Sequence, residues 1–551
     1  MLRAQTFISA VFALISINAF AQNCTSERYL NNIFQSSVSQ DVVFGNSPAI
    51  TAVYVAENVT VNQAMTMDVF FPVGDVLEKR PLVVLAFGGG FLVGTKDDED
   101  VWATCDSLAK KGYVTASINY RKNMNIADPS SAVRAIYRGA QDFSAAIRYL
   151  KEFSGTYGID TNYVFVGGVS AGGFSAMHAV FLDENERPAA TYQSGILGVN
   201  PDLGCVHCSG NGYQHTTNVR GIINLWGALM DTSYIQQNEL VPMTLFHGTD
   251  DLIVPYDYGF PFTALFLMPE VFGSFNVAAR VNHLGGNAEL NSYPTGHNIW
   301  GVNVNNVMVG GPTEYWNPIT DSIISFLYEN IRPAQPQLNI TAPACQSDTV
   351  FIQITNFPLG GRGCWNVELG DVVWSNTDSS SIGVVWDSEG IYEVEAVVFN
   401  HLEAFSFPTT MEVEVNPSPT VSITNTNGLL EASGNYPHYQ WYLDGQLLQG
   451  ENQAQLIPTS LGYYTVEATN AEGCSALSEP LVAVGIQEQF SSLTSVAIIK
   501  VFDAMGRLIA EIGNPSEFAA QKWSAVQLLF VQYFDADRNL IGSEKKLTSA
   551  F

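Results

Sequence analysis

Short apolar runs alternate with longer segments of helical periodicity between about residues 41 and 333. Several of these runs are rich in β-branched and aromatic residues without strict alternation, as in strands that are covered on both faces. The predicted strands span residues 81–87, 113–120, 162–168, 221–227, 242–248 and 288–294. Between the second and the third, apolar residues recur at helical spacing from Val133 to Leu150 and predict a crossover helix. This pattern is typical of an α/β domain with a mostly parallel sheet.

The pattern changes after a proline-containing break over residues 328–338. From there, Val, Thr, Ser and aromatic residues dominate and helical periodicity almost disappears. The motif G-x-Y-x-V-E-A begins at Gly390 and again at Gly462, and each copy follows a tryptophan-containing segment. This repeat predicts two β-sandwich modules of one type over residues 336–416 and 417–485, each with the tyrosine of an immunoglobulin-like tyrosine corner.

The two ends of the chain have patterns of their own. Residues 1–21 combine a charged start, a short apolar run and an Ala-Phe-Ala cleavage motif, as in a secretory signal. Strand-like runs and D-x-x-G or D-x-D-x-N turns predict a small β domain over residues 486–551, and the α/β domain would span residues 22–335. No later apolar segment reaches the ~20 residues of a membrane-spanning helix. We therefore expect an exported protein that does not span a membrane.

Composition narrows the range of partners. The chain has 551 residues, of which 46% are hydrophobic, enough to fill several cores. Its 53 acidic residues exceed its 24 basic residues and give a formal net charge of -29. Such a surplus repels DNA, RNA, anionic lipid and other polyanions. We therefore exclude a nucleic-acid-binding function.

Seven cysteines are present, and an oxidising compartment would favour disulfides between them. Proximity suggests that Cys205 pairs with Cys208 and Cys345 with Cys364, although sequence does not fix the pairing and the odd count leaves one thiol over. The CVHC segment followed by His215 could form a zinc site, but a single C-x-x-C in a secreted chain is more often a disulfide. We expect no metal.

The segment GGVSAGG places Ser170 between small residues, after the strand predicted over residues 162–168 and before an alanine-rich helical run. The pattern G-x-S-x-G over residues 168–172 forms a sharp turn that lifts a serine hydroxyl off the end of a strand. The same serine could also be a helix N-cap. A nucleophilic role requires a base, an acid that orients the base, and donors for the oxyanion.

Candidates for these partners follow other predicted strands, at the sheet edge where parallel strands place their ligands. Asp251, with its neighbour Asp250 as the alternative, follows the strand over 242–248, and His297 follows the strand over 288–294. Glycines 88–90 follow the first strand, where the backbone can approach a ligand closely. The chain order Gly loop, Ser, Asp, His is that of α/β-hydrolases. Three other histidines have packing, structural or surface positions in the predicted elements: His178, His247 and His283.

These motifs together resemble a known family. FGGGF, GGVSAGG, HGTDDLIVPY and the following Gly-His pair look like a secreted, carboxylesterase-type α/β-hydrolase of the bacterial esterase/lipase group, over nearly all of residues 41–333. The resemblance implies an α/β-hydrolase fold and a serine esterase without a cofactor, in which Ser170 attacks the ester, His297 transfers the proton and Asp251 orients the imidazolium. The implied oxyanion donors are the amides of Gly89, Gly90 and Ala171. Phe87 stands where the family usually has histidine, which leaves the anchoring of the glycine loop open.

The C-terminal segment is similar to sorting domains of the type IX secretion system, with VFDAMGRLI and DADRNLIGSEKKL as its two halves. One departure is that LLFVQYF lacks the glycine usually found before its strand. This resemblance implies the type IX secretion machinery as a partner and a location outside the cell or attached to its surface. The sandwiches look like the Ig-like or PKD-like modules often found between a catalytic domain and such a signal.

Three further segments could shape a site. The long polar insertion over residues 183–220 could form a lid, a pocket wall or a solvated structural loop. The apolar, aromatic segment over residues 258–273 could line a hydrophobic site or form a buried helix. The charged stretch over residues 96–100 fits a helix N-terminus better than a calcium site.

We therefore predict a secreted serine hydrolase that cleaves neutral, moderately hydrophobic carboxylic esters through an acyl-enzyme. Polysaccharide acyl or feruloyl esters, or a polyester, are the candidate substrates, and an insoluble polymer would suit the accessory sandwiches. Two alternatives stay open. A serine peptidase of the prolyl-oligopeptidase type shares the residue order, but nothing like its β-propeller precedes the domain. A surface adhesin on an inactive hydrolase scaffold, with carbohydrate-binding sandwiches, is compatible with Phe87.

Overall fold

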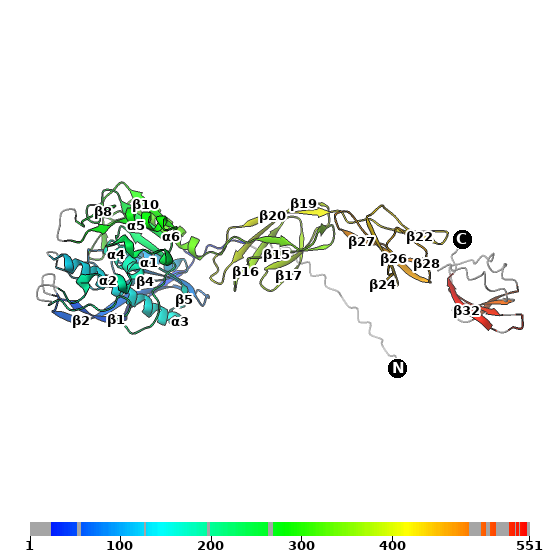
Figure 1. Ribbon diagram of the computed structural model, residues 1–551, viewed down its shortest axis with the longest axis horizontal. Helices are drawn as coiled ribbons and strands as arrows, with labels where there is room; N and C mark the ends of the chain where they lie inside the picture. The colour runs from blue at the N-terminus through cyan, green and yellow to red at the C-terminus, as the bar shows by residue number, and fades with distance from the viewer. Residues whose placement is uncertain are drawn as a thin grey trace, which may run out of the picture.

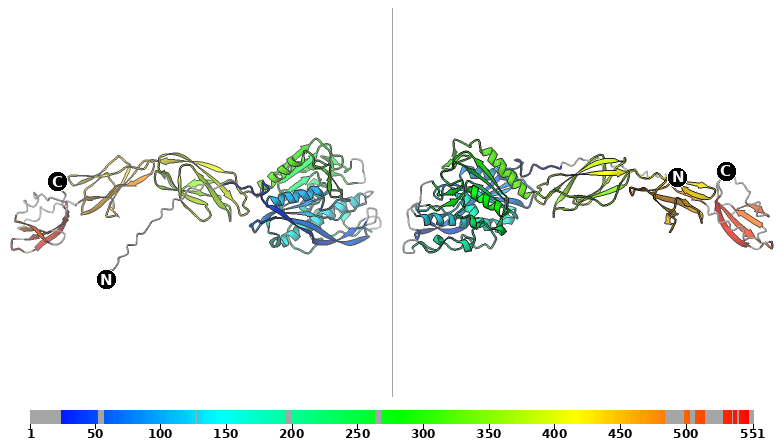
Figure 2. Two further views of the ribbon diagram at one scale, coloured as in Figure 1. Left: turned by 180° about the vertical axis from the view of Figure 1, so that it is seen from behind. Right: turned by 45° about the horizontal axis from the view of Figure 1, so that its top comes forward.

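The computed structural model describes most of the chain after the N-terminus. The described residues are 24–51, 57–125, 128–194, 199–262, 268–483, 498–502, 507–513, 528–534, 536–538 and 540–547. The predicted signal peptide over residues 1–21 lies outside them. An α/β part and three all-β parts follow one another along the long axis of the molecule (Figures 1 and 2).

Eight strands form the central sheet of the α/β part. In sheet order they are β1 (Gln35–Ile50), β2 (Thr60–Val73), β4 (Val114–Ile118), β3 (Arg80–Ala86), β5 (Ile159–Val169), β6 (Gly221–Leu225), β7 (Met243–Gly248) and β10 (Ala288–Tyr293). The pairs β1/β2 and β2/β4 are antiparallel, and all other neighbours are parallel. The mostly parallel sheet confirms the predicted fold class, an α/β-hydrolase fold followed by antiparallel β sheets.

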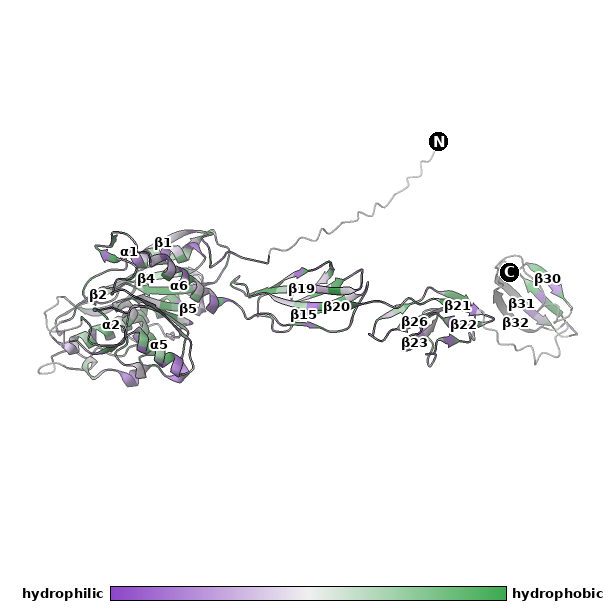
Figure 3. Ribbon diagram, turned by 90° about the horizontal axis from the view of Figure 1, so that it is seen from above, coloured by the Kyte–Doolittle hydropathy of each residue, from purple (hydrophilic) through white to green (hydrophobic). Residues whose placement is uncertain are grey.

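Helices cover both faces of this sheet (Figures 1 and 3). They are α1 (Glu99–Lys110), α2 (Pro129–Glu152), α3 (Ser154–Tyr157), α4 (Ala171–Phe181), α5 (Ser274–His283) and α6 (Trp316–Ile331), with short 3-10 turns η1 (Glu184–Glu186), η2 (Ala189–Thr191), η4 (Thr232–Tyr234) and η5 (Gln237–Glu239). Helix α2 begins with a proline after Asp128, whose side chain accepts a hydrogen bond from the Ser130 amide, a favoured helix start. Helix α4 packs against both α2 and β5, which fixes its first residues above the middle of the sheet.

Two short hairpin-like pairs complete the α/β part. They are β8 (Tyr258–Gly259) with β9 (Val271–Phe272), and β11 (Val302–Val304) with β12 (Val307–Val309). The second pair follows His297 and turns at Asn305 and Asn306, both of which have positive φ. Asparagine tolerates this conformation better than most residues, so the sequence of the tip suits a tight turn.

The first sandwich, residues 338–416, consists of two sheets that share one core. Its strands are β13 (Leu338–Ile340), β15 (Thr349–Ile354), β18 (Ser381–Val385) and β17 (Asp371–Ser375) in one sheet, and β14 (Ala344–Cys345), β20 (Thr409–Asn416), β19 (Gly390–Phe399) and β16 (Arg362–Val367) in the other. Buried residues of both sheets surround Trp386. Tyr392 stacks on Trp386 and donates a hydrogen bond to the Ser388 carbonyl, the contact expected of a tyrosine corner.

The second sandwich, residues 421–483, repeats this arrangement. Its strands are β21 (Ile423–Thr426), β22 (Leu429–Ala432) and β25 (Gln455–Leu456) in one sheet, and β24 (Gln446–Leu447), β23 (His438–Leu443), β26 (Gly462–Thr469), β27 (Ser475–Leu477) and β28 (Leu481–Ala483) in the other. Trp441 is buried in its core, and Tyr464 donates a hydrogen bond to the Ser460 carbonyl. The repeated sequence motif thus corresponds to a repeated structural feature.

The C-terminal part contains one four-stranded antiparallel sheet among its described residues. Its strands, in sheet order, are β30 (Leu508–Ile512), β29 (Ile498–Phe502), β31 (Leu528–Phe534) and β32 (Leu540–Leu547). The turn within VFDAMGRLI, residues 503–506, lies outside the described residues. No helix in the described ranges is long and apolar enough to cross a membrane.

Three disulfides are present, and one predicted pairing is wrong. Cys205 bonds to Cys208 as expected, but Cys345 does not bond to Cys364. The two lie on β14 and β16, which are the opposite edge strands of one sheet. Proximity along the chain therefore gave the wrong partner. The observed long-range bonds are Cys24–Cys364 and Cys345–Cys474, and Cys105 is a buried free thiol.

The first sandwich also reaches into the core of the α/β part. Its loop over residues 400–405 carries Leu402, which is fully buried among the apolar residues of the α/β core. The Tyr29 hydroxyl donates a hydrogen bond of 2.9 Å to the Leu402 carbonyl. The Asn400 side chain donates one of 2.7 Å to the Ile331 carbonyl at the end of α6. These contacts join the two parts across the boundary predicted at residue 335.

Candidate active site

Ser170 lies at the tip of the turn between β5 and α4. Its φ of 51° is unusual for a residue with a side chain, and such strained positions cluster at functional sites. The turn closes tightly because Gly168 and Gly172 have no side chains. A Cβ at Gly168 would collide with the Gly172 backbone, and a Cβ at Gly172 would collide with the Ala86 carbonyl. The glycines on either side are therefore what allow this turn to present the hydroxyl.

Loops from two other strands bring a histidine and an aspartate to this hydroxyl. The Ser170 Oγ lies 2.9 Å from Nε2 of His297, which follows β10. The Nδ1 of His297 lies 2.7 Å from Oδ2 of Asp251, which follows β7. Asp250, the alternative acid, is exposed to solvent and makes no such contact. The structure therefore joins Ser170, His297 and Asp251 in one chain of hydrogen bonds, the geometry that activates a serine for nucleophilic attack.

Asp251 is held in place by several donors. Its Oδ1 accepts hydrogen bonds from the amides of Ile253, 2.8 Å, and Val254, 2.9 Å. Its Oδ2 lies 3.2 Å from Nε2 of His247 in addition to its contact with His297. Burial alone would raise the pKa of Asp251, but the hydrogen bonds from His247 and His297 outweigh burial and hold this pKa well below its ordinary value. The carboxylate therefore stays ionised beside His297.

His247 supports this acid, a role that the sequence analysis did not assign. Its Nδ1 lies 2.6 Å from the Ser274 hydroxyl, and its ring is completely buried. The only signal in the sequence is its position four residues before Asp251, which a strand and a tight turn bring back together. His178, by contrast, is a packing residue as expected: burial lowers its pKa to about 4, and its ring bonds to the Phe174 carbonyl and the Met230 amide.

The glycine loop lies beside Ser170. Gly89 and Gly90 both have positive φ, and a Cβ at Gly89 would collide with the Val93 carbonyl. Two cavities meet at Ser170: Gly89 borders one of them, Ala171 borders the other, and Gly90 borders both. The Ala171 amide is the first of helix α4, where amides have no partner within the helix. All three residues thus border the space beside Ser170 in which an oxyanion would form.

Phe87 anchors this loop in a different way from a histidine. Its ring is fully buried and stacks on Tyr120, with 4.3 Å between the ring centroids. The Tyr120 hydroxyl donates a hydrogen bond of 3.0 Å to the Phe87 carbonyl. Stacking and this hydrogen bond therefore replace the side-chain anchoring that the sequence left open.

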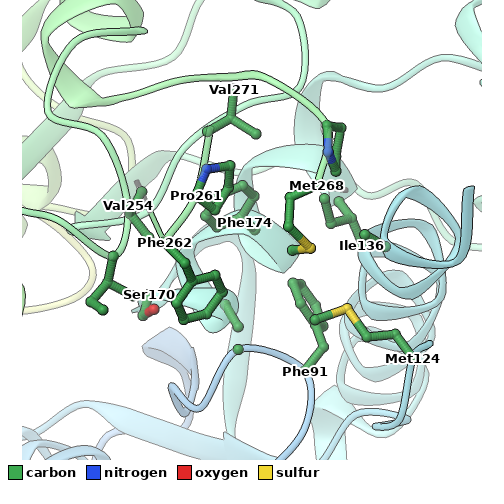
Figure 4. Close-up of a pocket in the computed structure, with 15 residues that line it drawn as sticks. Phe91, Met124, Ile136, Ser170, Phe174, Val254, Pro261, Phe262, Met268 and Val271 are labelled. Atoms are coloured by element: carbon green, nitrogen blue, oxygen red, sulfur yellow. The ribbon is translucent and has the colours of Figure 1, made fainter. Parts of the chain in front are cut away.

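The two cavities differ in polarity: the lining of the first is almost entirely apolar, and that of the second combines polar groups with apolar side chains. The first, the apolar pocket, has a volume of about 40 Å³ and runs from Ser170 toward Ile136 and Met124 (Figure 4). It is lined by Gly90, Phe91, Met124, Ala132, Ile136, Ser170, Ala171, Phe174, Ile253, Val254, Pro261, Phe262, Met268, Pro269 and Val271. Its walls are almost entirely hydrocarbon, so it suits an apolar group attached to the carbon that Ser170 would attack.

The second cavity, the polar groove, is wider and has a volume of about 820 Å³. It is lined by Gly88, Gly89, Gly90, Leu92, Val93, Gly94, Thr95, Asp98, Asp100, Lys122, Val169, Ser170, Trp226, Ile253, Phe262, His297, Asn298, Gly301, Val302, Asn303, Val304, Asn305 and Asn306. Carboxylate, amide, hydroxyl and ammonium groups thus border the side of Ser170 on which His297 lies. This side suits a polar group that can form many hydrogen bonds.

The structure decides between the alternatives for the two uncertain segments. Pro261, Phe262, Met268 and Val271, all from residues 258–273, line the apolar pocket, while residues 263–267 lie outside the described residues. No helix is present among the described residues of this segment.

The insertion over residues 183–220 is a structural loop as far as it is described, without residues 195–198. Four side chains of α2 donate hydrogen bonds to its backbone carbonyls, and none of its described residues lines either cavity. The donors are Arg134, Gln141, Arg148 and Lys151. Buried cations on α2 therefore hold this loop in place, and its described residues form no wall of either cavity.

Within the described ranges, no group of three or more His, Cys, Asp or Glu side chains is arranged to hold a metal ion. The zinc alternative for Cys205 and Cys208 is wrong because these two sulfurs form a disulfide. The charged stretch over residues 96–100 leads into α1, in agreement with the helix interpretation.

Asp100 lies at the start of α1, on the floor of the polar groove, and is almost completely buried. Its carboxylate accepts a hydrogen bond of 3.3 Å from the Trp300 indole. Burial nevertheless dominates and raises the pKa of Asp100 from 3.8 to about 6.

We expect Asp100→Asn to remove a pH-dependent part of the stability. The folded protein holds the Asp100 proton more tightly than the unfolded chain, so this proton stabilises the fold fully below pH 3.8. The contribution, about 3 kcal/mol, is lost as the pH rises through about 6. Guanidinium unfolding from about pH 4 to pH 7 should therefore show wild type losing stability relative to the variant. A difference that does not change with pH would contradict the raised pKa.

Comparison with known proteins finds one matching family. Residues 67–231 match the family model described as BD-FAE. The matched segment contains the glycine loop, Ser170 and Ala171, and ends before Asp251 and His297. No curated protein matches the chain.

Similar solved structures include three of esterase 2 from the planctomycete Thermogutta terrifontis. The propionate-bound form has a TM-score of 0.34, the paraoxon-phosphorylated form 0.32 and the apo form 0.33. Each is 18% identical to this chain, and each alignment covers 52% of this chain and 94% of the esterase. The chain is therefore a carboxylic ester hydrolase, and the segment of its α/β part that carries the serine turn is similar to esterases of the BD-FAE type.

Proposed function

We propose that this enzyme cleaves esters through a covalent acyl-enzyme on Ser170. His297 Nε2 accepts the Ser170 proton while Oγ attacks the ester carbonyl, and the amides of Gly89, Gly90 and Ala171 stabilise the oxyanion. His297 then gives the proton to the departing alcohol. A water molecule, deprotonated by His297, releases the carboxylic acid and restores the Ser170 hydroxyl. Asp251 holds the imidazole in the required tautomer, and the hydrogen-bond chain supports this assignment.

The two cavities support separate binding places for the acyl group and the alcohol of the ester. The apolar pocket would take the acyl group, and the polar groove beside His297 would take the alcohol that leaves with the proton. We propose as substrates the esters of small or moderately apolar acids with a polyhydroxylated alcohol, such as acylated polysaccharide. The polar groove, with Asp98, Lys122 and Asn303 in its lining, is the observation that favours this class over a polyester. The family model, of bifunctional acetyl and feruloyl esterases, agrees with it.

A location outside the cell is a second part of this proposal. The secretory pattern of residues 1–21 and the sorting-type motifs of residues 486–551 support export through the type IX secretion machinery. The three disulfides support it as well, because disulfides persist in oxidising compartments. Fractionation of cells that express the full chain would test it: the mature protein is expected in the medium or on the cell surface, and retention in the cytoplasm would contradict the proposal.

The size of the apolar pocket predicts the preference for acyl groups. With p-nitrophenyl esters from acetate to palmitate, we expect kcat/KM to be highest for short chains, because Ile136 and Met124 close the pocket (Figure 4). Ile136→Ala should lengthen the pocket and raise the ratio of octanoate to acetate hydrolysis by about tenfold or more. A wild-type enzyme that cleaves palmitate as well as acetate would contradict the assignment of this pocket.

A matched control is available on the same helix. Ile147→Ala removes the same atoms from a fully buried site of α2 that borders neither cavity. This variant should lose comparable stability without a change in acyl preference.

A comparison of acetylated xylan with an aliphatic polyester, under the same conditions, tests the alcohol part of the substrate. Faster cleavage of the polyester would overturn the carbohydrate assignment.

A further inference from the structure

An aromatic pair lies on the outer face of the first sandwich. Phe351 of β15 and Trp374 of β17 are 46% and 47% exposed, and their ring centroids are 5.6 Å apart. Both residues pair with Gly383 of the strand between them, β18. The three residues therefore form one row across three strands, on the face opposite the buried Ile382 and Val384.

A β-bulge places Trp374 in this row. The register of β17 shifts between Val372 and Trp374, so that one extra residue, Val373, stands opposite no single partner. Without the extra residue, Val373 would lie opposite Gly383, and Trp374 would lie opposite Ile382 on the core side. The bulge thus turns the largest side chain of this strand outward, and bulges of this kind often re-aim a side chain at a functional site.

Gly383 keeps the space between the two rings free of a side chain. A Cβ at this position would lie 3.3 Å from Phe351 Cε1, 3.3 Å from the Trp374 Cβ and 3.0 Å from the Thr349 methyl group. Aromatic rings often cover a glycine in a neighbouring strand and stabilise the sheet in that way. Here about half of the surface of each residue remains exposed to solvent, so the pair also presents apolar area to a ligand.

Polar side chains border the aromatic row along the strands. On one side, Thr349 of β15 and Asp371 of β17 both pair with Val385 of β18. On the other side, Gln353 stands opposite Ser381. The aromatic row with these neighbours, which we call the aromatic platform, thus combines an apolar centre with hydroxyl, amide and carboxylate groups at its edges.

We propose that the aromatic platform binds a neutral polysaccharide chain. A sugar ring has one apolar face of C–H groups and a rim of hydroxyls, so it matches exposed rings that have hydrogen-bonding neighbours. The platform contains no Lys or Arg, and the net charge of -29 disfavours anionic polymers. This inference rests on the proposed function only in its choice of polymer. The polysaccharide that the platform binds would carry the ester groups that the α/β part cleaves.

The test uses the full mature chain in affinity gels that contain deacetylated xylan, galactomannan or soluble β-glucan. We expect at least one of these polymers to retard the wild-type protein, and Trp374→Ala and Phe351→Ala to weaken the binding by about tenfold or more. The control, Ile391→Ala, removes a side chain that is 65% exposed on the other sheet of the same sandwich. Its binding should equal that of the wild type.

Each result supports or contradicts the proposal that the aromatic platform binds polysaccharide. Binding by none of the three polymers, or equal binding by the wild type and Trp374→Ala, overturns it. Self-association that is lost in Trp374→Ala, measured by sedimentation without polymer, would show that a second copy covers the rings instead. Hydrolysis of soluble p-nitrophenyl acetate should be the same in all four proteins. If hydrolysis is absent in all four, the proposed function is wrong. The affinity gels still test whether the aromatic platform binds polysaccharide.

Discussion

Ser170→Ala is expected to lower kcat for p-nitrophenyl acetate by at least about a thousandfold. The variant retains the oxyanion donors and both cavities but has no oxygen to form the acyl-enzyme. Residual hydrolysis would come from water in a preorganised site, and substrate binding should change little because the hydroxyl contributes mainly to the transition state. Wild-type enzyme should also release a burst of p-nitrophenol stoichiometric with active sites, and the variant should release none.

Ser175→Ala is the matched control for this experiment. Ser175 lies in the same helix, α4, is fully buried, and donates a hydrogen bond to the Ala171 carbonyl one turn earlier. Its replacement removes the same hydroxyl group close to the site and should cost about 1 kcal/mol of stability, with little effect on the chemistry. A Ser170→Ala enzyme with activity within tenfold of the control would show that another group is the nucleophile.

Asp251→Asn is expected to lower kcat by about ten-thousandfold. The amides of Ile253 and Val254 both donate to one oxygen of this side chain, so the asparagine must keep its carbonyl oxygen there. Its NH2 group then points at His297. Two N–H groups cannot face each other, so the imidazole adopts the wrong tautomer, with its proton on the nitrogen beside Ser170.

Asp250→Asn separates this effect from a general loss of negative charge. The two residues are neighbours, but Asp250 is exposed and Asp251 is buried, so only the second should matter for chemistry. We expect Asp250→Asn to keep kcat within a few-fold of the wild type. Near-UV circular dichroism should be the same for the two variants and the wild type. Equal losses in both variants would contradict the assignment of the acid to Asp251.

The sequence predicted the centre of the fold better than its edge. Strands such as β5 and β7 are buried on both faces, so their apolar runs stand out in the sequence. Strands β1 and β2 were not predicted. The outer of the two, β1, is largely exposed, and its residues are mostly polar or small. The hairpin β11–β12 has exposed valines and leaves a similarly weak pattern.

The candidate site followed from the topology more than from any one motif. Ser170, Asp251 and His297 each come after a parallel strand, and the ends of these strands meet at one edge of the sheet. Contacts that depend on side-chain packing could not be predicted in this way. His247 reaches Asp251 through a turn of the backbone, and the partner of Cys364 lies 340 residues earlier, at Cys24. The first relation leaves only the four-residue spacing between His247 and Asp251, and the second leaves no periodic or local trace in the sequence.

The burial of Leu402 in the α/β core limits where recombination can separate the domains of this protein. A gene fragment that stopped at residue 335 would encode an α/β part with an unfilled apolar site and without the Asn400 cap on the last turn of α6. Recombination at that boundary would therefore be selected against, and the hydrolase and the first sandwich should descend together. The second sandwich is tied on through Cys345–Cys474, so a replacement there needs to preserve one cysteine rather than a shared core.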